Sequence, residues 1–447
     1  MRTMVACVLV AGCGFGVPAS TAVVDADIDA PPPPIDAFVR DVPPRLIPGG
    51  GIADAPLAHV LNVYAIDSVT RLPIMDASVT IGAISGMTDA TGLFVARGEA
   101  VTGKATIAIT KEGYRAEIWI GVAGANATLP LKPQPLAGVP RADLSGVFSN
   151  FNSNLPPLGG GHLRSGSVTY SQLDGAPDGA NGINSMGSNR CQSGSCAFSI
   201  ATRVGTVALL GATFDVDTKN TQDPNDDTSV VQTYSYRTGI TVVDGVALNN
   251  QNLTQIAPSQ LVDVTTTFGT LAPGTTVAVG VVAIDLPTEG TLYLSDNAEM
   301  NTPTIKAPPL SLFAGSSYRV LGFAGVNGGF SLLFRRGFTA SPFNLGTWLP
   351  TPTLVSATRA GASWTAPTGA TFSGVLYSRP FVADLVQVLS FDGTTTFTLP
   401  PAITLPTASF DVSAIAFRAG YDFSDFSFAE DAALYDATSS SSGVAVP

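Results

Sequence analysis

Short runs of alternating apolar and polar residues recur along most of the chain, separated by turns rich in glycine, asparagine and aspartate. A period of two residues is typical of β-strands with one buried face, whereas a helix needs a period near 3.6. No helical stripe longer than about two turns precedes the acidic stretch near the C-terminus. The pattern therefore predicts an all-β protein, built as tandem antiparallel β-sandwich domains after a disordered Pro-rich tether.

Composition excludes several classes of protein. Charged residues make up 13% of the 447 residues, and the formal net charge is −12. A nucleic-acid-binding protein needs a basic stripe that faces the phosphates, and this acidic chain offers none. Its 45% hydrophobic content is too high for general disorder, yet no apolar run is long enough for a membrane-spanning helix. The length favours several folded domains over one.

The N-terminus has the layout of an export signal. Residues 1–12 carry one arginine, then a short apolar stretch, then small residues. The following sequence Val10-Ala11-Gly12-Cys13 resembles the lipobox of bacterial lipoproteins. The resemblance implies that residues 1–12 are removed, that Cys13 carries acyl chains such as palmitate, and that this lipid is the contact with the membrane. With Gly14 next, it also implies an outer-membrane lipoprotein of the cell envelope. The alternative is cleavage after Ala19 or Ala22, which would release a secreted protein.

Residues 13–56 are rich in proline and aspartate and show neither strand nor helix periodicity. Such a segment favours extended, stiff conformations. We expect it to act as a tether between the lipid and the folded part of the chain. A tether of this kind has a use only in an anchored protein, so its presence supports lipidation.

Residues 57–132 are expected to form a small β-sandwich. The segment contains alternating strands and a turn, Thr88-Asp89-Ala90-Thr91-Gly92-Leu93-Phe94, in which Gly92 supplies the open backbone angle and Asp89 caps the turn. Together with the strand around Val79 and the Gly113-Tyr114 pair, this turn resembles the carboxypeptidase regulatory-like (transthyretin-like) domain. That family is an accessory module without a catalytic residue of its own, so the resemblance implies surface location more than activity.

Residues 141–350 contain further strand-like runs, and we expect them to form one or two β domains. The residues do not indicate a family for this segment. Cys191 and Cys196 lie close together in this segment. In an exported chain the pair predicts a small loop-closing disulfide, and a redox-active pair is the alternative.

The best candidate for a ligand site is the acidic stretch from residue 215 to residue 227. Calcium takes six to eight oxygen ligands, and exported β domains place such acidic loops between strands. The stretch therefore predicts a Ca²⁺ site, although its spacing is not that of an EF-hand. The alternative is a solvated hairpin loop. The candidate calcium ligands are Asp215, Asp217, Asp223, Asp226 and Asp227.

Residues 351–437 resemble a fibronectin type III-like sandwich. The matching features are Trp364 followed by Ala366-Pro367, a strand that ends in Tyr377, and a Phe397-Thr398-Leu399-Pro400 turn. Trp364 is expected to anchor the core rather than to hold a ligand. Residues 438–447 are expected to form a disordered tail.

No catalytic residues are predicted. The chain has no Gly-x-Ser-x-Gly, His-Glu-x-x-His or P-loop motif, and its only histidines are His59 and His162. The sequence therefore favours a lipid-anchored envelope protein with a non-catalytic binding or structural role and a carbohydrate or protein partner at the cell surface. Two alternatives stay open. One is a secreted or anchored hydrolase that acts on polysaccharide or peptide and carries the β-sandwich domains as accessory modules. The other is a calcium-dependent adhesin.

Overall fold

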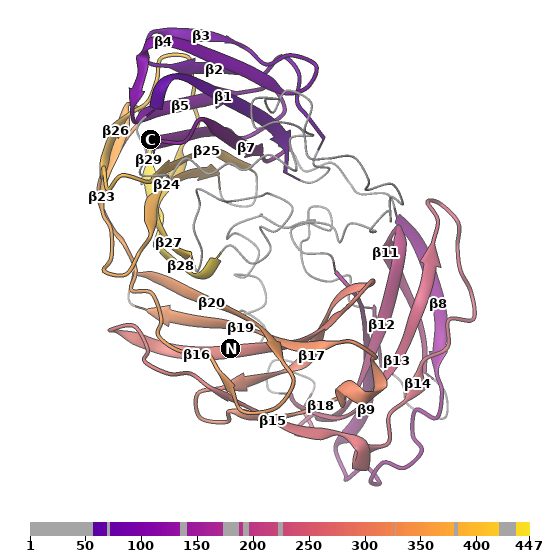
Figure 1. Ribbon diagram of the computed structural model, residues 1–447. Coiled ribbons are helices and arrows are strands. Elements are labelled where there is room, and N and C mark those ends of the chain that lie inside the picture. Colours follow the sequence, from indigo (N-terminus) through magenta and orange to yellow (C-terminus); the bar gives the residue numbers. More distant parts are fainter. Residues whose placement is uncertain are drawn as a thin grey trace, which may run out of the picture. The chain divides into compact units, whose positions relative to one another are not determined.

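The computed structural model describes residues 57–68, 72–134, 141–172, 187–190, 196–221, 227–326, 328–379, 383–419 and 435–447. The described chain is all-β, as predicted: it consists of strands and two short 3-10 turns (Figure 1). It packs as two compact units. The middle unit comprises residues 141–326 and 331–348, and the split unit comprises residues 57–134, 328–330 and 349–447.

The split unit contains strands from both ends of the described chain. The N-terminal segment contributes β1 (Leu57–Asp67), β2 (Ser78–Ile81), β3 (Ile84–Met87), β4 (Leu93–Gly103), β5 (Ala105–Thr110), β6 (Ala116–Val122) and β7 (Asn126–Leu131). The C-terminal segment contributes β22 (Thr353–Thr358), β23 (Gly361–Thr365), β24 (Phe372–Arg379), β25 (Ala383–Ser390), β26 (Thr396–Thr398), β27 (Phe410–Ala419), β28 (Tyr435–Ser441) and β29 (Val444–Val446).

These strands form a long central sheet with a smaller sheet against each of its faces. The central sheet runs in the order β3-β2-β5-β6-β25-β24-β27, and β28 and β29 both pair with β27. Residues 438–447, predicted to form a disordered tail, therefore belong to the sheet, because their backbone pairs with β27. The smaller sheets are β4-β1-β7 and β22-β23-β26. Every residue of β6 is buried, because this strand is covered on both faces. Its sequence Ala-Glu-Ile-Trp-Ile-Gly-Val is accordingly apolar at nearly every position.

Two cores lie on the opposite faces of the central sheet. Trp119 of β6 and Phe417 of β27 belong to the core under β4-β1-β7. Ile118 of β6 and Tyr377 of β24 belong to the core under β22-β23-β26, together with Trp364. The alternation of side chains along β6 therefore supplies both cores. Trp364 is 2% exposed, and its indole N–H donates to Ser373 Oγ at 2.9 Å, which fits its expected role as a core anchor.

Residues 57–132 and 351–437, which the sequence suggests as separate sandwiches, share one sheet and one core. The link is β25, which pairs in parallel with β6, with Gln387 opposite Glu117 and Leu389 opposite Trp119. Phe372 and Phe417 of the C-terminal segment pack in the same core as Ile107 and Trp119. Parallel pairing needs a long connection between the strands. Here the connection includes the whole middle unit, and no local pattern reveals it.

The turn that carries the family resemblance has the expected local structure. Gly92 has a φ of +74°, and a Cβ there would lie 2.5 Å from the carbonyl oxygen of Ala65. Asp89 Oδ1 accepts hydrogen bonds from the backbone N–H of Thr91 at 2.8 Å and of Leu93 at 3.1 Å. Gly92 and Asp89 thus have the roles predicted from the sequence.

The middle unit is a second set of packed sheets. Its sheets are β10-β9-β12-β13-β14, β11-β8, β18-β15-β21 and β17-β16-β19-β20. The bounds are β8 (Arg141–Phe148), β9 (His162–Tyr170), β10 (Gly187–Arg190), β11 (Cys196–Arg203), β12 (Gly205–Asp217), β13 (Thr228–Val242), β14 (Thr254–Gln255), η3 (Pro258–Gln260), β15 (Val262–Thr267), β16 (Thr275–Leu286), β17 (Gly290–Glu299), β18 (Thr304–Ala307), η4 (Leu310–Leu312), β19 (Ser317–Val326), β20 (Gly329–Phe338) and β21 (Phe343–Asn344).

A core between β11-β8 and the sheet that contains β9 and β12 organises one part of this unit. Phe148 lies at its centre and makes edge-to-face contacts with Phe151 and Phe198. Arg203, 6% exposed, joins this part to the β16–β17 hairpin, because its guanidinium donates to the carbonyl oxygens of Ser171 and Glu289. Most strand pairs of the chain are antiparallel as predicted, whereas β1 with β7, β15 with β21 and β25 with β6 run parallel.

Candidate functional site

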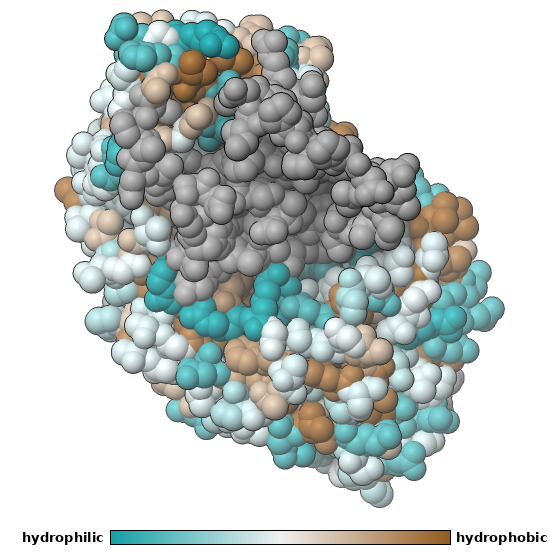
Figure 2. Space-filling view, viewed as in Figure 1, coloured by the Kyte–Doolittle hydropathy of each residue, from teal (hydrophilic) through white to brown (hydrophobic). Residues whose placement is uncertain are grey.

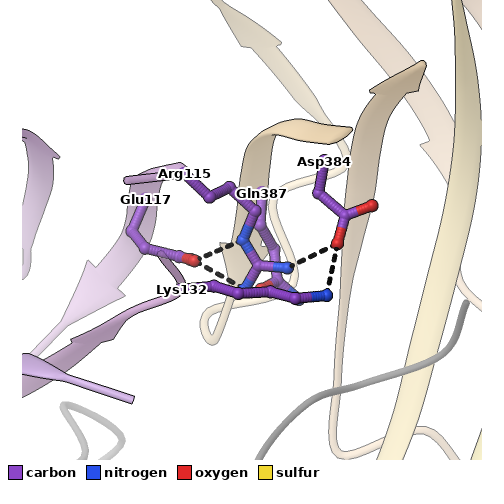
Figure 3. A network of polar contacts seen from close by, with 5 residues as sticks. All are labelled: Arg115, Glu117, Lys132, Asp384 and Gln387. Atoms are coloured by element: carbon purple, nitrogen blue, oxygen red, sulfur yellow. Dashed lines mark hydrogen bonds and ion pairs between the residues drawn. The ribbon is translucent and has the colours of Figure 1, made fainter. Parts of the chain in front are cut away.

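A buried cluster of charged and polar side chains lies where β6 and β25 pair in the split unit (Figure 3). Glu117 and Gln387 are register partners on these two strands. Arg115 comes just before β6, and its backbone N–H donates to the carbonyl oxygen of Lys132, just after β7, at 2.7 Å. Asp384 lies near the start of β25. The pairing of strands from both segments therefore brings these side chains together.

Arg115 holds the cluster together. Its Nε and Nη2 lie 2.8 and 2.7 Å from the same oxygen, Oε1 of Glu117. Its Nη1 lies 3.5 Å from Oδ2 of Asp384, and Nη2 also donates to the side-chain oxygen of Gln387. Lys132 Nζ lies 2.8 Å from the same Asp384 oxygen. Two cations thus face two carboxylates, so the cluster has no net charge when all four groups are ionised.

Burial differs across the cluster. The side chains of Arg115 and Glu117 are 5% and 1% exposed, whereas those of Lys132 and Asp384 are 16% and 17% exposed. Glu117 Oε2 is buried and has no hydrogen-bond partner. Removal of water from a carboxylate disfavours its charged form. Burial accordingly raises the pKa of Glu117 to about 7, against the opposing effect of the Arg115 guanidinium.

This shift predicts a pH-dependent stability. Because the folded-state pKa of Glu117 lies above its ordinary value of 4.5, its favourable contribution is complete below about pH 4.5 and is lost as the pH rises through about 7. We expect wild-type protein to lose unfolding free energy relative to Glu117→Gln between about pH 5 and pH 8. Urea denaturation of both proteins across this range measures the difference. A difference that stays constant, or that favours wild type as the pH rises, would contradict the assignment.

The acidic stretch predicted to bind calcium begins at the end of β12. Asp215 Oδ1 lies 2.7 Å from Nδ1 of His162, on the neighbouring strand β9. Asp217 accepts hydrogen bonds from the backbone N–H and the ammonium group of Lys219, which lower the pKa of this carboxyl. Asp227 directly precedes β13. Asp223 and Asp226 lie outside the described residues.

Two of the five predicted ligands therefore contact a histidine and a lysine. Among the residues that the structure describes, no three His, Cys, Asp or Glu side chains are grouped so that they could hold a metal ion. The calcium site stays a prediction. The register of β9 and β12 sets His162 opposite Asp217 and diagonal to Asp215. This register has no signal in the sequence, so the pair of His162 with Asp215 was not predicted.

The cysteines are only partly within the described chain. Cys196 at the start of β11 is buried and disulfide-bonded. Cys191, its expected partner, and Cys13, the expected lipidation site, lie outside the described residues. No helix in the described part of the chain is long and apolar enough to cross a membrane.

Large apolar side chains are exposed at several places on the described surface. Met87 on β3, Val230 on β13 and Val355 on β22 are each more than 60% exposed, and they belong to different sheets. Figure 2 shows hydrophobic residues interspersed with hydrophilic ones over the coloured part of the visible face.

The cluster around Arg115 was not predicted from the sequence, although a signal was present. Glu117 interrupts a strand that is otherwise apolar, and Gln387 does the same in Leu385-Val386-Gln387-Val388-Leu389. A charged or polar residue in a strand that is covered on both faces needs a buried partner. That rule indicates that Glu117 and Gln387 have partners, but it does not identify them.

Comparison with known proteins adds little. No protein-family model and no curated protein matches the chain. The chain is similar, at 9% identity and a TM-score of 0.13, to the native conformation of Escherichia coli alpha-2-macroglobulin, and the match covers 85% of this chain and 29% of that one. It is also similar, at 10% identity and a TM-score of 0.14, to a tetra-tandem repeat in the extending region of a large adhesion protein, covering 87% of this chain and 99% of that one. Scores this low carry no argument about fold or function.

Proposed function

We propose that this protein is a lipid-anchored cell-envelope protein with a non-catalytic binding or structural role. The observation that carries the proposal is the burial of Glu117. A pKa of about 7 would suit this carboxyl to proton transfer, yet its side chain is 1% exposed. An acid or base in catalysis must reach the substrate. The cluster that contains Glu117 is therefore better suited to holding the split unit together than to turnover.

The anchor in this proposal is Cys13. The lipobox-like sequence Val10-Ala11-Gly12-Cys13 and the Pro- and Asp-rich segment 13–56 support it. A single acyl chain binds membranes only marginally, so stable attachment needs several chains on the same cysteine. The β units would then be held away from the outer membrane by the tether, where a carbohydrate or protein partner can reach them.

Replacing Cys13 with serine tests the anchor. We expect Cys13→Ser to lose labelled palmitate and to leave the membrane fraction of a bacterial host, because the acyl chains supply the attachment. Cys7→Ser is the matched control, since it removes a cysteine of the same signal without touching the lipidation site, and it should keep label and location. Palmitate that persists on Cys13→Ser would overturn the lipid anchor.

A further inference from the structure

β1 and β7 are the first and last strands of the N-terminal segment of the split unit, and they pair in parallel (Figure 1). The paired residues run from Asn62 opposite Asn126 to Asp67 opposite Leu131. Parallel strands start at the same end of a pair and finish at the other end. The chain therefore enters this pair at the start of β1 and leaves it at the opposite end, after β7.

A load that reaches β1 from its N-terminal side pulls along these two strands. In the proposed function, the tether joins the lipid on Cys13 to Leu57, the first residue of β1. The chain leaves β7 at Leu131 and continues to Arg141, where β8 of the middle unit begins. A partner held by the middle unit would thus pull β7 in one direction while the anchor pulls β1 in the other.

From this geometry we infer that the β1–β7 pair is a mechanical clamp, which keeps the split unit folded when a bound partner pulls against the anchor. The inference rests on the proposed function for the source of the load. When two strands are pulled lengthwise in opposite directions, all the hydrogen bonds between them carry the load at once and must break together. When two strands are pulled apart from one end, the bonds break one after another, and each rupture needs little force.

Hydrogen bonds at both ends reinforce the pair. The backbone N–H of Asn62 donates to the carbonyl oxygen of Ala125 at 2.8 Å, and that of Ser68 donates to the carbonyl oxygen of Leu131 at 2.9 Å. Between the side chains, Nδ2 of Asn62 donates to Oδ1 of Asn126 at 2.9 Å. The hydrogen-bonded ladder therefore extends beyond β7 at its start and beyond β1 at its end.

Burial strengthens the clamp further. Every residue from Leu61 to Ser68 is buried, and Ala127, Leu129 and Leu131 of β7 are fully buried. Water replaces a stretched hydrogen bond at an exposed strand, whereas a buried donor that loses its acceptor has no other partner. Sliding of β1 past β7 would also draw apolar side chains of both strands out of the core that they share.

The antiparallel pair of β1 with β4 supplies an internal comparison. Leu57 lies opposite Gly103, so β1 starts where β4 ends. A load applied between Ala55 and Lys104 therefore opens this pair from one end. A load applied between Ala55 and Gln134 instead shears β1 against β7. The two geometries load the same strand of the same folded unit, so their difference isolates the direction of the pull.

Single-molecule force spectroscopy of the full chain tests the clamp. The chain carries Cys13→Ser, so that it is not lipidated, and handles are attached through azide-bearing side chains at positions 55 and 134, or at positions 55 and 104. At one pulling speed, we expect the first rupture between 55 and 134 to need at least about threefold more force than that between 55 and 104, because forced unfolding is governed by the unfolding barrier. Equal forces, or a lower force between 55 and 134, would overturn the inference.

Asn126→Ala is the matched variant, because it removes the side-chain bond between β1 and β7 and leaves the β1–β4 pair unchanged. Held at constant force between positions 55 and 134, it should rupture at least about twofold faster than the same chain with Asn126. Its rupture between 55 and 104 should be unchanged. If both geometries change equally, the β1–β7 contact is not what resists the load, and the clamp is wrong. Failure of the anchor is recognised separately, by palmitate labelling.

Discussion

Replacing Arg115 with methionine is expected to cost the split unit about 3–5 kcal/mol of unfolding free energy at pH 8. Methionine fills much of the same volume, so the loss is mainly electrostatic. At this pH Glu117 is largely ionised in wild type, and without the guanidinium its charge is buried and unpaired. Proton uptake by Glu117 reduces the loss at lower pH, so the deficit should shrink toward pH 5. Guanidinium chloride denaturation at several pH values measures both effects.

Two further variants identify the cause of that loss. Glu99 contacts His59 at 3.8 Å and is almost fully exposed, so Glu99→Gln should leave stability unchanged. The double variant Arg115→Met/Glu117→Gln should recover part of the stability lost in Arg115→Met, because no buried charge then lacks a partner. If the double variant is less stable than Arg115→Met alone, the loss comes from packing rather than from the unpaired carboxylate.

Truncation of Phe417 to alanine is also expected to lower the unfolding free energy of the split unit by about 3–5 kcal/mol. Phe417 is fully buried, and its ring stacks on Phe372 with centroids 4.8 Å apart. It lies in the core that contains side chains of both segments of the split unit. The cavity should therefore lower the stability of the N-terminal segment as well as that of the C-terminal segment.

Tryptophan fluorescence distinguishes these outcomes in variants that keep either Trp119 or Trp364, with the other tryptophans, Trp348 of the middle unit included, replaced by phenylalanine. Trp119 reports on the N-terminal segment and Trp364 on the C-terminal segment, and each is buried. In Phe417→Ala, both signals should shift to lower denaturant by the same amount. Val355→Ala, at a side chain that is 65% exposed on β22, is the control and should change stability by less than about 0.5 kcal/mol. A shift confined to Trp364 would mean that the two segments do not share a core.

Local patterns predicted much of the fold. Alternation and turn chemistry indicated the all-β class, the Asp89–Gly92 turn and the burial of Trp364, because each depends on residues close in sequence. The pairing of β25 with β6 depends instead on two buried strands far apart in the chain. Such strands are apolar on both faces and do not specify a partner. The sequence alone therefore could not predict that the two segments share a sheet.

The candidate sites likewise contain parts that the sequence predicts and parts that depend on the fold. The acidic residues from Asp215 onward were visible as a cluster in sequence, but the contacts of Asp215 with His162 and of Asp217 with Lys219 depend on strand register and turn geometry. The buried cluster was hidden because its charges are scattered through three segments. Only the shared sheet brings Arg115 and Asp384 together. The types of these side chains do not show that residues so far apart in the sequence lie close together in the structure.

The central claim is that residues 57–134 and 349–447 form one folding unit around the Arg115 cluster. Native-state hydrogen exchange, followed by mass spectrometry at increasing denaturant, tests it on the unmodified chain. The account predicts that the amides of β6 and of β25 exchange with the same opening free energy and the same dependence on denaturant, because neither strand keeps its sheet without the other. If β25 exchanges at low denaturant while β6 stays protected, the two segments are separate domains and the account is wrong.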